Sequence, residues 1–189
     1  MKEQILIFGL GHIGGSIAKS LCKKRTNVYA EDLSKKTIRY AIKNKIIKGT
    51  LSDLDLSKPY SIIFSTPPII TNTLVNENKD LIKNADLFTE TSSSKNKIKK
   101  NAFINKIENA VLSHPIAGNE GSGIDASDIK LFENKICILS PLKTTSRNSI
   151  RKAQKLWESL GSNCIKMDLN SHDKILAATS HLPHVISFS

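Results

Sequence analysis

Hydrophobic residues recur along the chain in two alternating patterns. Short apolar runs rich in β-branched residues, typical of strands, occupy residues 5–8, 28–30, 61–65, 87–89, 110–112, 136–139 and 163–167. Between them, apolar residues recur with the helical period, which predicts helices at residues 13–24, 35–43, 69–83, 95–103 and 145–160. This alternation predicts an α/β fold, with a doubly wound, mostly parallel sheet and helices on both faces.

Two stretches near the end of the chain extend this pattern. The helix predicted at residues 145–160 has one apolar stripe, so we expect Trp157 in the core rather than at a ligand. A further apolar helix begins near residue 171 and is still strongly apolar at residue 189. We expect a C-terminal partner to cover it.

The charge balance narrows the choice of partners. The chain has 28 Lys and Arg against 17 Asp and Glu, and a net charge of +11 suits nucleic acid, anionic lipid or small polyanions such as dinucleotides. The lysines are dispersed, with the densest cluster at residues 95–100, and only 5% of residues are aromatic. This pattern favours solvated helix faces, and we expect neither a nucleic-acid nor a membrane partner.

The cysteines and the N-terminus bear on the compartment. Cys22, Cys137 and Cys164 are odd in number and have no metal-type spacing, which predicts neither a disulfide framework nor a zinc site. The first apolar run is too short for a signal peptide or a membrane span. We therefore expect a soluble, cytoplasmic protein.

A glycine motif lies between the first predicted strand and the first predicted helix. In this G-x-G-x-x-G turn, Gly9 allows the sharp turn, Gly11 lets the backbone approach a pyrophosphate, and Gly14 lets the helix pack on the strand. The N–H groups at the start of the helix are then available to the phosphates. The predicted cofactor-binding residues of this turn are Gly9, Leu10, Gly11, His12, Ile13 and Gly14.

An acidic residue follows the second predicted strand at the spacing typical of a ribose-binding carboxylate. Asp32 would accept hydrogen bonds from the adenosine ribose and repel the extra phosphate of NADP, which favours NAD, although Lys35 and Lys36 weaken that preference. The alternative is that the glycines form only a structural turn and that Asp32 caps the helix starting near Ser34. The combined pattern favours a Rossmann-type NAD-binding domain.

Three further stretches resemble one family. They are Thr-Glu-Thr-Ser-Ser-Ser-Lys at residues 89–95, Ser-His-Pro-Ile-Ala-Gly-Asn-Glu-Gly-Ser-Gly at 113–123, and Ser-His-Leu-Pro-His at 180–184. With the glycine turn, in this order and spacing, they resemble the prephenate and arogenate dehydrogenases of tyrosine biosynthesis over essentially the whole chain. The resemblance implies an NAD-binding domain at residues 1–168 and the start of a helical dimerisation domain at 169–189.

The resemblance also implies a reaction and its residues. It implies NAD-dependent oxidative decarboxylation of prephenate to 4-hydroxyphenylpyruvate, or of arogenate to tyrosine, with a neutral histidine accepting the proton of the ring hydroxyl. His114 matches the catalytic histidine, and Ser93 matches the serine that positions it. The other implied contacts are Ser65, Thr66 and Pro67 for the cofactor, and Ser93, His114, Glu120, Ser122, His181 and His184 for the substrate.

The chain departs from the family pattern in two ways. Glu90, Ser92 and Ser94 replace the usual Asp, Gly and Val, and Ser92 puts a side chain where close backbone approach is expected. The helical domain that dimerises and supplies a substrate-binding arginine has no counterpart here, and the four arginines of the chain are on predicted helices or loops away from the site. We therefore expect NAD binding, but poor prephenate turnover unless another chain completes the site, and a homodimer only if those helices are present.

Alternatives remain open at this stage. The chain could be a truncated NAD-binding module, or another NAD-dependent dehydrogenase such as one acting on a 3-hydroxy acid, although no lysine-asparagine helix signature supports the latter. His181 and His184 could begin a metal site, but no carboxylate or cysteine completes it at a suitable spacing, so no metal is predicted. His172 receives no role, and the His172-Asp173 pair is interpreted as the start of the last helix.

Overall fold

A seven-stranded sheet forms the centre of the protein. The computed structural model describes residues 3–118 and 121–176. Within them the strand order is β2-β1-β3-β4-β5-β6-β7, and every neighbouring pair is parallel except β5–β6. The strands are β1 (Gln4–Phe8), β2 (Asn27–Glu31), β3 (Tyr60–Phe64), β4 (Leu87–Glu90), β5 (Ala110–Pro115), β6 (Ile136–Pro141) and β7 (Asn163–Lys166).

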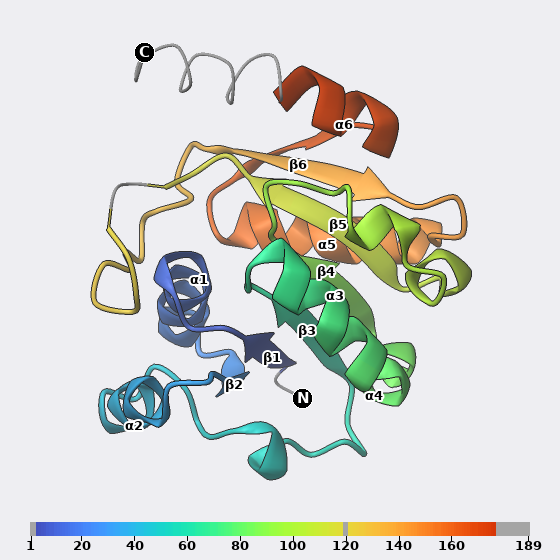
Figure 1. The fold of residues 1–189 in the computed structure, drawn as a ribbon. Coiled ribbons are helices and arrows are strands. Elements are labelled where there is room, and N and C mark those ends of the chain that lie inside the picture. The colour runs from blue at the N-terminus through green and yellow to red at the C-terminus, as the bar shows by residue number, and fades with distance from the viewer. Residues whose placement is uncertain (1–2, 119–120, 177–189) are drawn as a thin grey trace.

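Helices cover both faces of this sheet (Figure 1). Alternate residues of β1 point to opposite faces, so that Ile5 and Ile7 pack with α1 and α5, whereas Leu6 and Phe8 share the core of α3 and α4. The helices are α1 (His12–Lys23), α2 (Lys35–Lys43), α3 (Pro68–Glu77), α4 (Lys79–Asn84), α5 (Arg147–Ser159) and α6 (Leu169–Leu176). The predicted α/β, doubly wound, mostly parallel fold is confirmed.

Local sequence signals explain where several helices begin. The Ser34 hydroxyl accepts a hydrogen bond from the N–H of Thr37 at the start of α2, and Ser146 does the same for Ser149 in α5. Each satisfies an N–H group that has no partner within the helix. In α5 the predicted apolar stripe is buried, and Trp157 is fully buried against Phe132 with a ring-centroid distance of 5.5 Å, which confirms its place in the core.

The prediction of a helix at residues 95–103 is wrong. The structure has one single-turn 3-10 helix in this range, η2 (Ile98–Lys100), and a second directly after it, η3 (Ile104–Lys106). They are separated at Asn101, whose side-chain oxygen accepts hydrogen bonds from the N–H groups of Phe103 and Ile104. Asn competes for backbone groups in this way, and it interrupts the helix that the apolar spacing alone predicts.

Two other expectations need adjustment. The single helix predicted at 69–83 is divided at Asn78, whose φ of −116° is not helical, into α3 and α4. β6 reverses direction relative to β5, and the described part of the intervening segment has turns but no helix. An antiparallel neighbour needs no crossover helix, which accounts for this exception to the alternating pattern.

The end of the described chain lies against β6. There α6 begins after Asp168, whose carboxylate accepts hydrogen bonds from the N–H groups of Asn170 and Ser171. The predicted domain boundary after residue 168 stays a prediction. Among the described residues, no helix combines the length and apolarity needed to cross a lipid bilayer.

Candidate active site

The glycine turn joins β1 to α1 at the edge of the sheet where the parallel strands end. Gly9 has a φ of +90°, and its N–H donates to the carbonyl of Glu31 at 2.8 Å. A Cβ atom at Gly9 would lie 2.5 Å from the carbonyl oxygen of Ser65. Both the backbone conformation and the space therefore require glycine here.

The other two glycines of the motif differ in what surrounds them. A Cβ at Gly14 would lie 1.9 Å from the Gly9 carbonyl oxygen, so α1 packs directly on the turn. Gly11 precedes α1 as its N-cap, and no heavy atom lies within 4 Å of a Cβ built there. The space in front of the first N–H groups of α1 is thus left open on the protein side, as phosphate binding at this turn requires.

A cleft of about 610 Å³ adjoins this turn. The chain passes from β1 to β2 on one side and continues to β3 on the other, so the cleft lies at the switch point of the sheet. Asp32 lines it at the end of β2, and Ser65, Thr66 and Pro67 line it after β3. These four predicted cofactor residues are therefore brought together with Gly9 and Gly11.

The Asp32 carboxylate is held by two backbone N–H groups. Its Oδ2 accepts from Leu10 and its Oδ1 from Ser34, both at 2.8 Å. Each oxygen retains a further lone pair that a ribose hydroxyl could use. The interpretation of Asp32 as the cap of α2 is wrong, because Ser34 caps that helix.

Three predicted cofactor residues of the turn have side chains that do not line this cleft. Leu10 is buried in the core, and Ile13 packs against the same core. His12 is half-buried, and its Nε2 atom is buried without a hydrogen-bond partner. Any contribution of Leu10 and Ile13 to a ligand would therefore come from their backbone.

A pair of histidines lies further along the same edge of the sheet. His114, near the end of β5, is half-buried, and its Nδ1 is 3.0 Å from Nε2 of His172. His172 lies on α6 and is fully buried, with its Nδ1 3.0 Å from Oδ1 of Asp173. An aspartate, a buried imidazole and the predicted catalytic imidazole thus form one continuous row.

Asp173 receives two further hydrogen bonds from the segment after β4. The N–H of Lys95 donates to Oδ1 at 3.0 Å, and Nζ of Lys99 donates to Oδ2 at 3.1 Å. Partial burial raises the pKa of Asp173, but the hydrogen bonds from Lys95, His172 and Lys99 outweigh it, and the pKa is lowered from its usual value. Burial lowers the pKa of His172, and the Asp173 carboxylate opposes this only in part.

Lys95 carries a charged group into the interior at this point. Its side chain is fully buried, and Nζ contacts the Glu90 carboxylate and donates to the carbonyls of Ser92 and Ser113 at 2.7 and 2.5 Å. Burial lowers the pKa of Lys95, and Glu90 counteracts it. Because Ser113 directly precedes His114, this ion pair ties the end of β4 to the strand that carries the predicted base.

Two of the three residues that replace the family pattern, Glu90 and Ser92, belong to this cluster. Oε2 of Glu90 accepts a hydrogen bond from the N–H of Ser92 at 2.8 Å, while its other oxygen meets Lys95. The Ser92 side chain is buried, and its Oγ has no hydrogen-bond partner. The side chain that replaces glycine is therefore directed into the interior.

The remaining predicted site residues are less closely assembled. Ser93 and Ser122 are exposed, and no hydrogen bond within the described residues joins either of them to His114. Glu120, His181 and His184 lie outside the described residues. In the part of the chain that the structure describes, no three His, Cys, Asp or Glu side chains are grouped to hold a metal ion.

Sequence reasoning missed three residues of the cluster. Lys95 ends the 89–95 motif, and its spacing from Glu90 was a usable signal. His172 and Asp173 lie near the start of the last helix, which begins at Leu169, but the pair also contacts His114 and the segment after β4, which the prediction did not include. Adjacent His and Asp side chains were the available signal, but only the packing of α6 brings them to His114.

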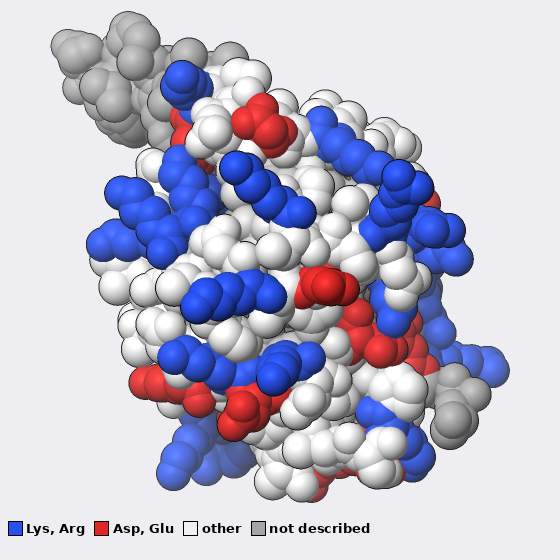
Figure 2. Space-filling view, turned by 90° about the vertical axis from the view of Figure 1, so that its right-hand side faces the viewer, with Lys and Arg blue, Asp and Glu red and all other residues white. Residues whose placement is uncertain are grey.

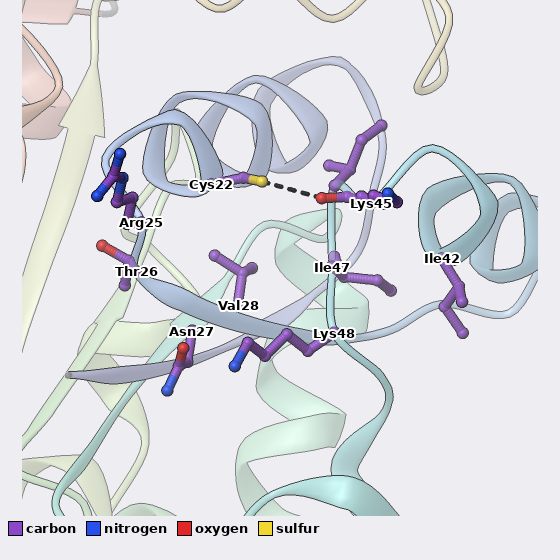
Figure 3. Close-up of a pocket in the computed structure, with 10 residues that line it drawn as sticks. Cys22, Arg25, Thr26, Asn27, Val28, Ile42, Lys45, Ile47 and Lys48 are labelled. Atoms are coloured by element: carbon purple, nitrogen blue, oxygen red, sulfur yellow. Dashed lines mark hydrogen bonds between the residues drawn. The ribbon is translucent and has the colours of Figure 1, made fainter. Parts of the chain in front are cut away.

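Two surface features lie apart from this cluster. Figure 2 shows Lys and Arg spread over one side of the molecule, among acidic and uncharged residues. A hollow of about 420 Å³ at the opposite end of β2 includes Cys22, Arg25, Lys45 and Lys48, and the Cys22 thiol donates to the Lys45 carbonyl at 2.9 Å (Figure 3). Its lining, among the described residues, includes no imidazole or carboxylate.

The fold and the glycine turn together define a dinucleotide-binding domain of the Rossmann class. The family model described as "Prephenate dehydrogenase, nucleotide-binding domain" matches residues 17–166, and the chain belongs to this family.

Individual relatives agree with this assignment. The prephenate dehydrogenase of Bacillus subtilis (strain 168) is 29% identical, and the match covers 100% of this chain and 53% of the relative. The crystal structure of the Aquifex aeolicus prephenate dehydrogenase with hydroxyphenyl propionate and NAD+ has a TM-score of 0.87 at 30% identity, over 100% of this chain and 68% of that one. The Synechocystis arogenate dehydrogenase structure has a TM-score of 0.81 at 26% identity, over 95% and 65%. The chain thus spans about half the length of the Bacillus relative.

Proposed function

We propose that the chain is the NAD-binding part of an enzyme that oxidatively decarboxylates prephenate or arogenate in tyrosine biosynthesis. The observation that carries this proposal is the placement of His114. Its imidazole lies at the same sheet edge as the glycine turn and is backed by His172 and Asp173. Family membership supports the reaction class, and the relatives named for prephenate and for arogenate leave both substrates in the proposal.

The cleft has the features that an NAD molecule needs. The start of α1 at Gly11 would bind the pyrophosphate, and Asp32 would accept the ribose hydroxyls and disfavour the extra phosphate of NADP. Ser65, Thr66 and Pro67 would border the cofactor in the same cleft. When bound, NAD supplies the acceptor for the hydride that leaves the hydroxyl-bearing ring carbon.

His114 would act as the general base of this reaction. As the hydride leaves, the ring hydroxyl must lose its proton so that the carbonyl can form, and the imidazole accepts that proton. The ring carboxylate departs as carbon dioxide, its bonding electrons enter the ring, and the carbonyl oxygen becomes a phenolate. This phenolate takes the proton back from the His114 imidazolium to give the phenol of the aromatic product. Ser93, Glu120, Ser122, His181 and His184 remain the proposed substrate contacts.

The proposal is tested by binding and turnover on matched proteins. NADH is titrated by fluorescence, and NADH formation is then followed with prephenate and with arogenate, using the chain and the longest protein that its gene encodes. We expect His114→Asn to bind NADH like the wild type and to lower kcat by at least ~10²-fold. Absence of NADH binding, or undiminished turnover by His114→Asn, would contradict the proposal.

A further inference from the structure

We propose that His172 and Asp173 are positioning residues that hold His114 in a single tautomer, with the proton on Nδ1 and the basic lone pair on Nε2. The effect on catalysis rests on the proposed function. The tautomer itself does not, because it is a property of the chain without substrate or cofactor.

Asp173 sets the direction of every hydrogen bond in the row. Its carboxylate accepts from the N–H of Lys95 and from Nζ of Lys99, and these donors favour the ionised form. An ionised carboxylate can only accept. The contact of 3.0 Å with His172 therefore requires that Nδ1 of His172 carry a proton.

The surroundings of His172 favour its neutral form. The side chain has no exposed surface, and burial disfavours the imidazolium form. The charged groups around it are Asp173 on its own helix and the Glu90–Lys95 pair, in which Lys95 opposes a positive charge and Glu90 favours one. A neutral ring protonated on Nδ1 has its lone pair on Nε2, so His172 presents an acceptor to His114.

The contact between the two rings sets the tautomer of His114. Because Nε2 of His172 is the acceptor, Nδ1 of His114 must be the donor across 3.0 Å. The neutral His114 ring then has its basic lone pair on Nε2. An isolated imidazole is a mixture of two tautomers, so this contact increases the fraction of His114 with the base on Nε2 and also fixes the orientation of the ring.

The structure offers a reason why this row is rigid. Asp173 accepts a hydrogen bond from the backbone N–H of Lys95. The side chain of Lys95 in turn donates a hydrogen bond to the Ser113 carbonyl, next to His114. Hydrogen bonds therefore link Asp173, both imidazoles and the end of β5 in a closed ring. This ring connects α6 to β4 and β5. A shift of α6 would have to break several of these hydrogen bonds together.

The tautomer is measured directly by nitrogen NMR. The chain is labelled with 15N at histidine, and the two-bond nitrogen–carbon-bound proton correlations of His114 are assigned by comparison with His114→Asn. We expect the pattern of a ring protonated on Nδ1 in the wild type at pH 7.5. A His114 ring protonated on Nε2 overturns the proposal, whatever the turnover assays show.

Two substitutions at His172 separate hydrogen bonding from packing. His172→Gln retains an amide oxygen that can accept from Nδ1 of His114, whereas His172→Phe retains a ring but no acceptor. We expect the Nδ1-protonated form of His114 to persist with Gln and to be lost with Phe. Persistence of that form in a folded His172→Phe protein would contradict the proposal.

Asp173→Asn tests the other end of the row. We expect a mixed His114 tautomer, and a kcat for prephenate or arogenate that is lower by roughly 10²-fold or more, with little change in the KM for NAD. Asp168→Asn is the matched control, because it removes an exposed carboxylate at the start of the same helix and asparagine caps equally well. An unchanged tautomer and kcat in Asp173→Asn, or an equal effect in Asp168→Asn, would contradict the positioning role of Asp173.

Discussion

At the level of single residues, glycine is expected at positions 9 and 11 of the turn for two different reasons. Gly9 is required by its positive φ and by the Ser65 carbonyl, which leaves no room for a Cβ atom. Gly11 has an ordinary φ of −69° and open space around its Cα, so the protein itself does not require glycine there. A ligand phosphate approaching the start of α1 would require it.

Alanine substitutions separate the two reasons. We expect Gly9→Ala to lower the free energy of unfolding by about 1–3 kcal/mol, because a side chain is strained at this φ. Gly11→Ala should leave stability unchanged and weaken NADH binding by tenfold or more, about 1.4 kcal/mol. Urea unfolding followed by Trp157 fluorescence and an NADH titration provide the two measurements. Wild-type affinity in Gly11→Ala would argue against phosphate binding at this turn.

Lys95 is a buried cation whose contribution to the stability of the fold depends on its partner, Glu90. With both side chains at 0% exposure, removal of either leaves the other charge uncompensated in the interior. Its three oxygen partners come from β4, from the segment after it and from β5. The pair therefore holds together the strand ends on which the candidate site is built.

Single and double substitutions show the coupling in this pair. We expect Lys95→Met to lower the free energy of unfolding by about 3–5 kcal/mol, and the double variant with Glu90→Gln to lose less than the sum of the single losses. The exposed Lys58–Asp55 pair supplies the control, since Lys58→Met should leave the urea midpoint nearly unchanged. Additive losses at Glu90 and Lys95 would mean that the two charges do not interact.

At the scale of elements, α6 is held to the sheet by polar contacts as well as by Leu169, which packs against the core. His172 and Asp173 bond it to β5 and to the segment after β4, while Ile175 is substantially exposed. Docking of this helix should therefore depend on the charge state of its groups. The segment at residues 95–106, with its two short 3-10 helices, is the other half of this contact.

The buried His172 makes stability depend on pH in a defined direction. Its pKa is lowered in the folded chain, so the unfolded chain binds this proton at a higher pH. The free energy of unfolding should therefore decrease as the pH falls below about 6.5. Urea unfolding at pH 7.5 and 5.5 measures the difference. We expect it to be smaller in His172→Gln and unchanged in Asp168→Asn, and an unchanged difference in His172→Gln would contradict this assignment.

At the scale of the whole molecule, the chain brings the proposed cofactor cleft and the proposed base to one edge of a single sheet. It spans 53% of the Bacillus relative. A carboxylate substrate is best held by an arginine. The arginines of this chain are Arg25, Arg39, Arg147 and Arg151, on or next to α1, α2 and α5, away from His114.

Because the proposed cofactor cleft and base lie in this chain while its arginines lie away from His114, we expect cofactor binding without efficient turnover. We expect the 189-residue chain to bind NADH and to oxidise prephenate or arogenate slowly, if at all. Addition of a helical segment that supplies an arginine should raise kcat/KM while changing NADH affinity little. The two titrations and a spectrophotometric assay measure this. Full activity of the chain alone would show that its own residues complete the site.

The amino-acid sequence by itself determined what depends on local pattern. The alternation of strands and helices, the glycine turn with Asp32, and the placement of Trp157 in the core follow from periodicity and from the conformational demands of single residues. Tertiary structure alone decided the reversal of β6 and the joining of Lys95, His172 and Asp173 to His114. These contacts join segments far apart in the chain, and buried charges and imidazoles obtain their partners only when those segments pack together.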